Sequence, residues 1–316
     1  MMKNLKVLGW FLVVFLLVGC AGMVNAEGKK IGIMWFEKSG MAKRVLAGFM
    51  EVFKAKAPDV ELEMHINLKD EEEAKPIYEK FQAGKDAILF LRSAGTTFMK
   101  KFPTKIPAFI GASNDPVILG VITDNNKPDN NITGVSYYIK ADKKIEIFKK
   151  VFPEMKSVGL IVEGKHPSAA VDEAETKAAC EAMGLTFEIA KVADKGEVLK
   201  SAKELAGKVN LIILGNQTLV SDNSKDVASV IGNIPMVSYM EKPVESGDAV
   251  CALAADDEKL GRMLAESVYE VVISGKKVEE VPVKFDSEPK FLLSEKAMKK
   301  WNVNVPEDLK KDAKMF

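Results

Sequence analysis

Arg92 stands out first for its chemistry, because it comes directly after five apolar residues, 87–91. A guanidinium at the end of a buried strand can hold a ligand carboxylate through two parallel hydrogen bonds, although a solvated arginine would give the same pattern. Ser93 and Thr96 follow it, and both suit the cap of a helix whose free N–H groups also attract anions. The stretch therefore predicts either an anion-binding loop or a solvated arginine beside ordinary helix caps.

A second polar stretch, "SNDP", follows the apolar run 107–112 and contains Ser113, Asn114 and Asp115. Pro116 is favoured in the first turn of a helix and Asp115 at its cap, so capping alone can explain these residues. If Asn114 or Asp115 also faces a ligand, its oxygen could accept a hydrogen bond from an ammonium or amide group. Both interpretations stay open at this point.

Other ligand-binding candidates are polar or aromatic side chains at the ends of further apolar runs. They are Trp35, Phe36, His166, Ser168, Asn216, Tyr239 and Glu241. Side chains alternate along a strand, so we expect one ring of the Trp35–Phe36 pair to face the ligand and the other the core. Tyr239 could stack on a ligand ring or pack in the core, and His166 suits an exposed loop. Glu241 could balance a ligand amine.

The segments that must position these side chains alternate between strand-like and helix-like patterns. Apolar runs predict strands at 30–36, 60–66, 87–91, 107–112, 157–162, 186–192, 211–215 and 235–240. Between most of them, apolar residues recur at helical spacing, which predicts helices at 41–57, 70–83, 94–101, 142–151, 168–183, 195–206 and 221–231. A further helix is expected at 256–274, closed by Gly275.

This alternation predicts an α/β fold with parallel sheets, and it runs twice, over 30–121 and 157–240. We therefore expect two doubly wound parallel-sheet lobes joined by a hinge. Open parallel sheets bind ligands beyond the carboxyl ends of their strands, so two facing lobes would hold a ligand in the cleft between them.

Four segments resemble a family of extracytoplasmic substrate-binding proteins of ABC transporters. They are "IPAFIGASNDPVILGVI" (106–122), "NNITGVS" (130–136), "ISGKKVEEVPVKF" (273–285) and "VNVPEDL" (303–309). The resemblance implies a type I periplasmic-binding-protein fold whose chain crosses three times between lobe 1 (30–137 plus 254–282) and lobe 2 (138–253 plus 283–316). The family usually has a Tyr-Asn-Pro-Gly-Glu-like turn where this chain reads "VEGKHPSAA" (162–170). This difference bears on which ligand the protein binds and leaves the expected fold unchanged.

By that resemblance, the protein captures a small ligand, such as an amino acid or other small carboxylate, and delivers it to an ABC transporter permease with its ATPase. Characterised members are similar to binders of aromatic amino acids, and we expect a monomer without cofactor or metal. The alternative is a sensing protein that docks on a membrane receptor. An enzyme is disfavoured because the sequence has only two histidines and none of the common catalytic or nucleotide-binding motifs.

The start of the sequence predicts export. Lys3 and Lys6 precede the apolar run 7–19, which is typical of a signal peptide (1–20). Leu17-Val18-Gly19-Cys20 resembles a lipobox, which implies a lipidated Cys20 followed by a tether (21–29). Cleavage after Ala26 is the alternative. Either route places the protein outside the cytoplasm, as a membrane-anchored lipoprotein or a periplasmic protein.

Charge and cysteine content narrow the possibilities further. The sequence has 45 basic and 45 acidic residues, so there is no basic footprint for nucleic acid. Beyond the signal, Cys180 and Cys251 are too few for a disulfide scaffold or a zinc cluster. They are either buried thiols or one disulfide.

Overall fold

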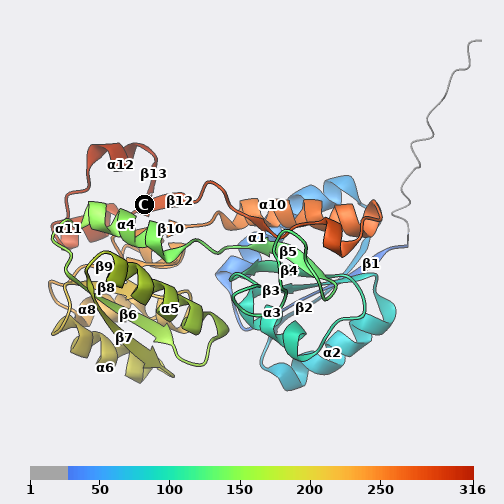
Figure 1. The fold of residues 1–316 in the computed structure, drawn as a ribbon, viewed down its shortest axis with the longest axis horizontal. Helices are drawn as coiled ribbons and strands as arrows, with labels where there is room; N and C mark the ends of the chain where they lie inside the picture. Colours follow the sequence, from blue (N-terminus) through green and yellow to red (C-terminus); the bar gives the residue numbers. More distant parts are fainter. Residues whose placement is uncertain (1–27) are drawn as a thin grey trace, which may run out of the picture.

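The computed structural model describes residues 28–316, which form two α/β lobes that lie side by side (Figure 1). The sheet of lobe 1 is parallel throughout, with the strand order β11-β5-β4-β3-β1-β2. Its strands are β1 (Lys30–Phe36), β2 (Glu61–Leu68), β3 (Ala87–Leu91), β4 (Ala108–Ser113), β5 (Ile132–Ser136) and β11 (Lys284–Phe285). All five residues of β3 are buried, as expected for a strand covered on both faces.

Helices cover both faces of the lobe 1 sheet. α1 (Gly40–Lys56) and α10 (Asp257–Val268) pack on one face, and α2 (Glu71–Gly84) and α3 (Arg92–Lys101) on the other. α1 and α10 approach closely at Gly48 and Gly261, where an added Cβ would collide with the carbonyl oxygens of Glu258 and Val45. Two segments more than 200 residues apart in sequence therefore build one layer of lobe 1.

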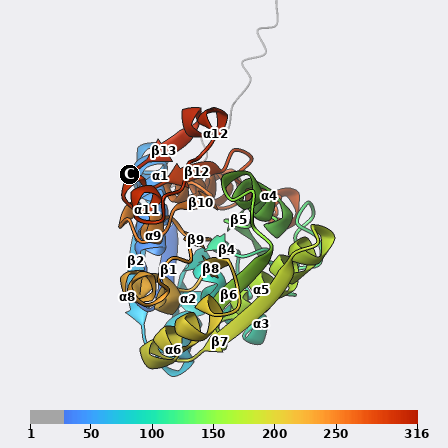
Figure 2. The ribbon, with the colours of Figure 1, turned by 90° about the vertical axis from the view of Figure 1, so that its left-hand side faces the viewer.

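The sheet of lobe 2 has the order β13-β12-β10-β9-β8-β6-β7, and only the β10–β12 pair is antiparallel. The strands are β6 (Ser157–Glu163), β7 (Thr186–Val192), β8 (Leu211–Leu214), β9 (Met236–Ser238), β10 (Cys251–Ala254), β12 (Lys290–Leu293) and β13 (Ala313–Met315). Figure 2 looks onto this lobe and shows α5 on one side of the sheet and α6 and α8 on the other.

The helices of lobe 2 enclose two separate hydrophobic clusters, one on each face of the sheet. They are α4 (Ala141–Val151), α5 (Pro167–Ala182), α6 (Lys195–Ala206), α7 (Thr218–Asp222), α8 (Ser224–Val230), α9 (Glu241–Glu245), α11 (Glu295–Lys300) and α12 (Glu307–Lys311). Two parallel-sheet α/β lobes are therefore present, as the sequence predicts.

The chain passes between the sheets after β5, after β10 and after β11. We expected the third crossing near 283, but β11 pairs with β5, so the chain stays with the first sheet through Phe285. The second and third crossings are tied together by ion pairs, with Lys259 Nζ 2.7 Å from Asp286 Oδ1 and Lys290 Nζ 2.6 Å from Asp256 Oδ2.

Three helix predictions need correction. Residues 116–120 form turns and no helix follows Asp115, because the chain turns back at Gly120, whose φ is 67°. The single helix expected at 221–231 is two short helices, α7 and α8. The helix expected at 256–274 changes at Tyr269 into a π-helical turn, η1 (Tyr269–Ile273), before Gly275.

Cys180 and Cys251 are both buried free thiols, and burial raises the pKa of Cys180 to about 11. The predicted signal peptide, the lipidation site Cys20 and the alternative cleavage point after Ala26 lie outside the described residues. Within residues 28–316, no helix combines the length and apolar character needed to cross a bilayer.

Candidate functional site

The carboxyl edge of the lobe 1 sheet has an irregular backbone at three strand ends. Glu37 (φ 54°), Arg92 (φ 72°) and Ala112 (φ 50°) all adopt the left-handed region, which is costly for residues other than glycine. At Ala112 the β4–β5 register shifts, and the bulge re-aims the residues after it. Such strain at a sheet edge is typical of a functional surface.

Arg92 is buried, with 6% of its surface exposed, at the start of α3. Its Nη1 donates to the sulfur of Met41, and its guanidinium carbon lies 5.6 Å from the ring centroid of Tyr137. Among residues 28–316, no carboxylate oxygen lies within 4.0 Å of this guanidinium. A buried cation without a carboxylate partner is energetically unfavourable unless something else supplies the negative charge.

The other two candidates after β3, Ser93 and Thr96, form hydrogen bonds within the protein. The Oγ of Ser93 accepts from the backbone N–H of Asn114 at 2.9 Å and pairs with the Tyr137 hydroxyl at 3.2 Å. Thr96 is not a cap, because it lies one turn inside α3 and donates to the carbonyl of Arg92 at 3.2 Å. These bonds fix the backbone around Arg92.

Asp115 caps a turn. Its Oδ1 accepts from the backbone N–H groups of Val117 (2.8 Å) and Ile118 (3.3 Å), and both oxygens accept from Asn125 Nδ2 at 3.1 Å. The hydroxyl of Ser113 is buried and has no partner within the described part of the chain. Of the three polar residues in this loop, Asn114 lines an enclosed cavity.

Trp35 and Phe36 lie on opposite faces of β1. Trp35 is fully buried in the core beneath α1 and α10, so we correct its assignment to the cleft. Phe36 lines an open cavity of about 650 Å³ together with residues of both lobes, which include Arg92, Ser39, His166 and Thr218. This cavity has the size of a small-molecule site.

The wall of lobe 2 is organised around Asp172 on α5. Asp172 accepts from the backbone N–H of Asn216 (3.0 Å), from Asn216 Nδ2 (3.2 Å) and from Gln217 Nε2 (2.7 Å). Ser168, Asp172 and Thr176 are spaced four residues apart and form a polar stripe on the buried face of α5. The stripe fixes the loop after β8 and presents Asn216 to the cleft.

His166 is a neutral hydrogen-bonding residue in this structure. Its Nδ1 accepts from the backbone N–H of Ser168 at 3.2 Å and lies 2.8 Å from the Ser168 hydroxyl. Burial, together with the nearby charge of Arg92, lowers the pKa of His166 to about 3. The imidazole therefore keeps its remaining proton on Nε2.

Lys144 on α4 is the second buried cation. Only 5% of its surface is exposed, and its Nζ lies 4.0 Å from the ring centroid of Tyr239, whose hydroxyl pairs with Thr176 Oγ1 at 2.7 Å. Burial lowers the pKa of Lys144 to about 8, against the nearby charges of Asp172 and Glu175.

Two enclosed cavities at the lobe interface share Lys144, Asn216, Tyr239 and Tyr137. Each holds only about 10 Å³, which is room for about one water molecule. Met240 of lobe 2 is buried in the hydrophobic cluster of lobe 1, so the lobes are closed on each other.

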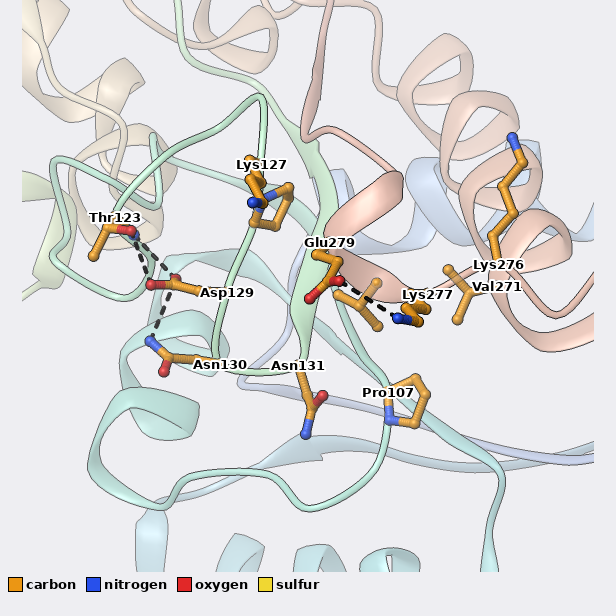
Figure 3. Close-up of a pocket in the computed structure, with 12 residues that line it drawn as sticks. Pro107, Thr123, Lys127, Asp129, Asn130, Asn131, Val271, Lys276, Lys277 and Glu279 are labelled. Carbon is orange, nitrogen blue, oxygen red and sulfur yellow. Dashed lines mark hydrogen bonds and ion pairs between the residues drawn. The ribbon is translucent and has the colours of Figure 1, made fainter.

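A further cavity of about 640 Å³ lies on lobe 1 alone (Figure 3). It is bordered by Pro107, the loop 123–131 and the segment 276–279, and Asp129 holds its loop by accepting from Thr123 Oγ1 at 2.9 Å. Pro107 and Asn131 precede β4 and β5, so this cavity lies at the amino ends of the strands. Ligands of open parallel sheets bind at the opposite ends, and we do not assign the ligand to this cavity.

A family model described as "ABC transporter substrate binding protein" matches residues 30–316. The chain belongs to this family. A tyrosine-binding protein of Clostridioides difficile strain R20291 is 24% identical over 282 residues, which is 87% of this chain and 81% of the relative.

Solved structures share the fold of this substrate-binding protein. An ABC domain in complex with L-Trp from Streptococcus pneumoniae has a TM-score of 0.83 at 21% identity, covering 91% of this chain and 99% of the other. The ligand-free, open structure of a substrate-binding protein with adhesive properties from Clostridium difficile has a TM-score of 0.74 at 21% identity, with the same coverage.

In this substrate-binding protein the candidates predicted from sequence fall into three groups. Those at the enclosed interface are Asn114, Asn216, Tyr239 and Glu241. Those at the open cavity are Phe36, Arg92 and His166. The side chains of Trp35, Ser93, Thr96, Asp115 and Ser168 instead serve the core or the hydrogen bonds that support the loops. Ser113 falls outside these groups, because its buried hydroxyl has no partner within the described residues.

Sequence reasoning missed Tyr137, Lys144, Asp172, Met41 and Asp257, all of which line the interface. Lys144 carried a signal, because it lies on the same face of its helix as Ala141, Ile145 and Phe148. A charged residue on an otherwise apolar helix face is rarely buried without a function or a partner.

Within residues 28–316 there is no group of three or more His, Cys, Asp or Glu side chains arranged to hold a metal ion. The contacts that the cavities at the interface offer a ligand are two cations, several amides and hydroxyls, and aromatic rings.

Proposed function

We propose that this substrate-binding protein captures a small carboxylate-bearing ligand, such as an amino acid, between its lobes and delivers it to an ABC transporter permease. The observation that carries the proposal is Arg92, a buried guanidinium at the carboxyl edge of lobe 1 without a carboxylate partner in the described chain. Its planar fork suits two parallel hydrogen bonds to a ligand carboxylate.

The relatives support an amino acid as the ligand class. One is named as a tyrosine-binding protein, and another structure holds L-Trp. The cleft residues of this chain offer contacts that suit an amino acid: a guanidinium for a carboxylate, Asn114 and Asn216 for hydrogen bonds, and Tyr137, Tyr239 and Phe36 as ring surfaces.

Transport would follow from lobe motion. In the open form the ligand meets Arg92 and the strand-end loops; closure brings Asn216 and Tyr239 of lobe 2 onto it and removes water, which strengthens each polar contact. The closed form then docks as a monomer on the permease with its ATPase, and reopening releases the ligand. A lipid on Cys20 would keep the protein at the membrane, whereas cleavage after Ala26 would free it.

A thermal-shift screen of the purified protein against amino acids, nucleosides and small acids tests the proposal. A ligand present at about 100 times its Kd should stabilise the folded protein by about 2.7 kcal/mol. Arg92→Gln should abolish the shift, whereas Arg262→Gln, which removes an exposed arginine paired with Glu51, should leave it unchanged. If no small molecule shifts the wild type, or if the protein turns over a substrate, the proposal is wrong.

A further inference from the structure

Lys144 has an unusual environment for a buried ammonium group. It lines both enclosed cavities at the lobe interface, yet the described chain gives its Nζ no hydrogen-bond acceptor and no carboxylate oxygen within 4.0 Å. The face of Tyr239 provides a cation–π contact at 4.0 Å, but it accepts none of the three N–H bonds. A lysine that exposes only 5% of its surface is stabilised by an anion that offsets the desolvation of its charge.

The neighbouring carboxylates are already engaged by protein donors. Asp172 is held by Asn216 and Gln217, and Glu175 accepts from the hydroxyl of Tyr138. Neither approaches Lys144 closely enough to form an ion pair.

Two further carboxylates that line the enclosed cavities are paired with basic residues. Asp257 pairs with Arg44 at 2.8 Å, and Glu241 pairs with Lys314 at 2.7 Å. Glu37 is exposed at the mouth of the open cavity. The two enclosed cavities are therefore lined by no carboxylate that lacks a donor, and the buried cations at the lobe interface, Arg92 and Lys144, have no ion-pair partner in the described chain.

These two cations come from different lobes but share the same neighbours. Met41 contacts Arg92 and lines a cavity with Lys144, and Tyr137 lies beneath Arg92 and lines both cavities with Lys144. Each enclosed cavity holds only about one water molecule while the lobes are closed, so a ligand beside Tyr137 and Met41 must enter when they are open. Closure of the lobes would then add the Lys144 contact to the Arg92 contact.

We propose that the ligand carries two carboxylate groups, one held by Arg92 of lobe 1 and the other by Lys144 of lobe 2. This inference rests on the proposed function and specifies its ligand class. Dicarboxylates and acidic amino acids share this chemistry. A neutral amino acid would leave Lys144 without an anion.

The test is calorimetric titration of the purified protein with four compounds: L-glutamate, glutarate, L-glutamine and L-tyrosine. L-Glutamine keeps the shape of L-glutamate but replaces one carboxylate by an amide. We expect at least one of the two diacids to bind at least tenfold more tightly than L-glutamine and L-tyrosine. If both diacids bind, the ligand ammonium is dispensable; if only L-glutamate binds, the ammonium is also recognised.

Two variants test whether Lys144 causes the preference for diacids. Lys144→Gln should weaken diacid binding at least tenfold and change L-glutamine binding much less. Lys143→Gln, which changes the exposed neighbour on the same helix, should alter neither. A folded Lys144→Gln protein that keeps the diacid preference overturns the inference.

The outcomes separate the inference from the proposed function. Tighter binding of L-glutamine or L-tyrosine than of both diacids overturns the two-carboxylate ligand and leaves amino-acid capture intact. If none of the four compounds binds, and the wider screen also finds no ligand, both proposals fall together.

Discussion

The ammonium of Lys144 lies 4.0 Å from the ring centroid of Tyr239, inside the closed interface of the two lobes. The geometry stabilises the charge only in part, since burial still lowers the pKa of Lys144 to about 8 from the usual 10.5. Folding therefore costs free energy at this position, because it removes from water an ammonium group that is solvated in the unfolded chain.

Lys144→Met should stabilise the ligand-free protein at pH 7 by about 1–3 kcal/mol, because it removes a buried charge while keeping most of the side-chain volume. The gain is limited because Asp172 loses a nearby cation. Urea denaturation at pH 7 measures it. Equal or lower stability of Lys144→Met would indicate that the protein itself already compensates the ammonium.

The same group predicts a pH dependence. Because the folded pKa of Lys144 lies below the unfolded value, the unfolded chain binds more protons between about pH 8 and pH 10.5, and wild-type stability should rise there through this group. Lys144→Met should lack that rise. Unfolding curves of both proteins across this range, recorded without ligand, provide the comparison.

Asp115→Ala should lower stability by about 1–2 kcal/mol, because it removes an oxygen that accepts from Val117, Ile118 and Asn125. Ligand affinity should change by less than about threefold, since both carboxylate oxygens already bind protein donors. Asp115→Asn keeps one acceptor and should lose less stability. A large loss of affinity in a stable Asp115→Ala protein would instead make Asp115 a ligand contact.

The layered fold could be predicted from sequence because its signals are local. Continuous apolar runs such as 87–91 and 211–214 can be buried only between two helix layers, and the structure contains them as β3 and β8. Ser39 caps α1, because its Oγ accepts from the backbone N–H of Ala42 at 3.2 Å. Gly134 fits its strand because a Cβ there would collide with the carbonyl oxygen of Ile110.

The composition of the interface was less predictable, because it depends on which distant loops meet. Arg92 follows a strand and was identified by that position. Lys144 and Asp172 lie on helices, and their functional placement depends on how α4 and α5 pack in lobe 2. The helix expected after Asp115 does not form for a similar reason, because a residue outside the local pattern intervenes. Asn125, ten residues later, donates to Asp115 and helps to close a turn.

Arg44→Met tests the ion pair that joins α1 to α10. Asp257 is buried, and although Arg44 offsets part of the cost, burial raises its pKa to about 6. Without Arg44 the ionised carboxylate is unpaired, so we expect a loss of about 2–3 kcal/mol at pH 7. The loss should be smaller at pH 5, where Asp257 can take up a proton.

The matched control is Arg262→Met, which removes an exposed pair with Glu51 between the same two helices. Exposed pairs contribute little, so its cost should stay below about 1 kcal/mol at both pH values. A loss from Arg44→Met that is equal at pH 7 and pH 5 would contradict a role for the Asp257 charge.

His166 leads to a prediction of the same sign as that for Lys144, but at lower pH. Its folded pKa of about 3 lies below the usual 6.5, so the unfolded chain binds more protons as the pH falls through this interval. Stability from this group is complete above pH 6.5 and is lost on acidification. His166→Gln should therefore show a shallower loss of stability between pH 6.5 and pH 4, measured by urea unfolding. If the variant and the wild type lose stability equally over this range, the imidazole is protonated in the folded protein. A protonated Nδ1 could not accept from the backbone N–H of Ser168.

The neutral ring also predicts that ligand affinity does not change between pH 5 and pH 8 through this group. A change in affinity with a midpoint in that range, present in the wild type and absent in His166→Gln, would contradict the assignment.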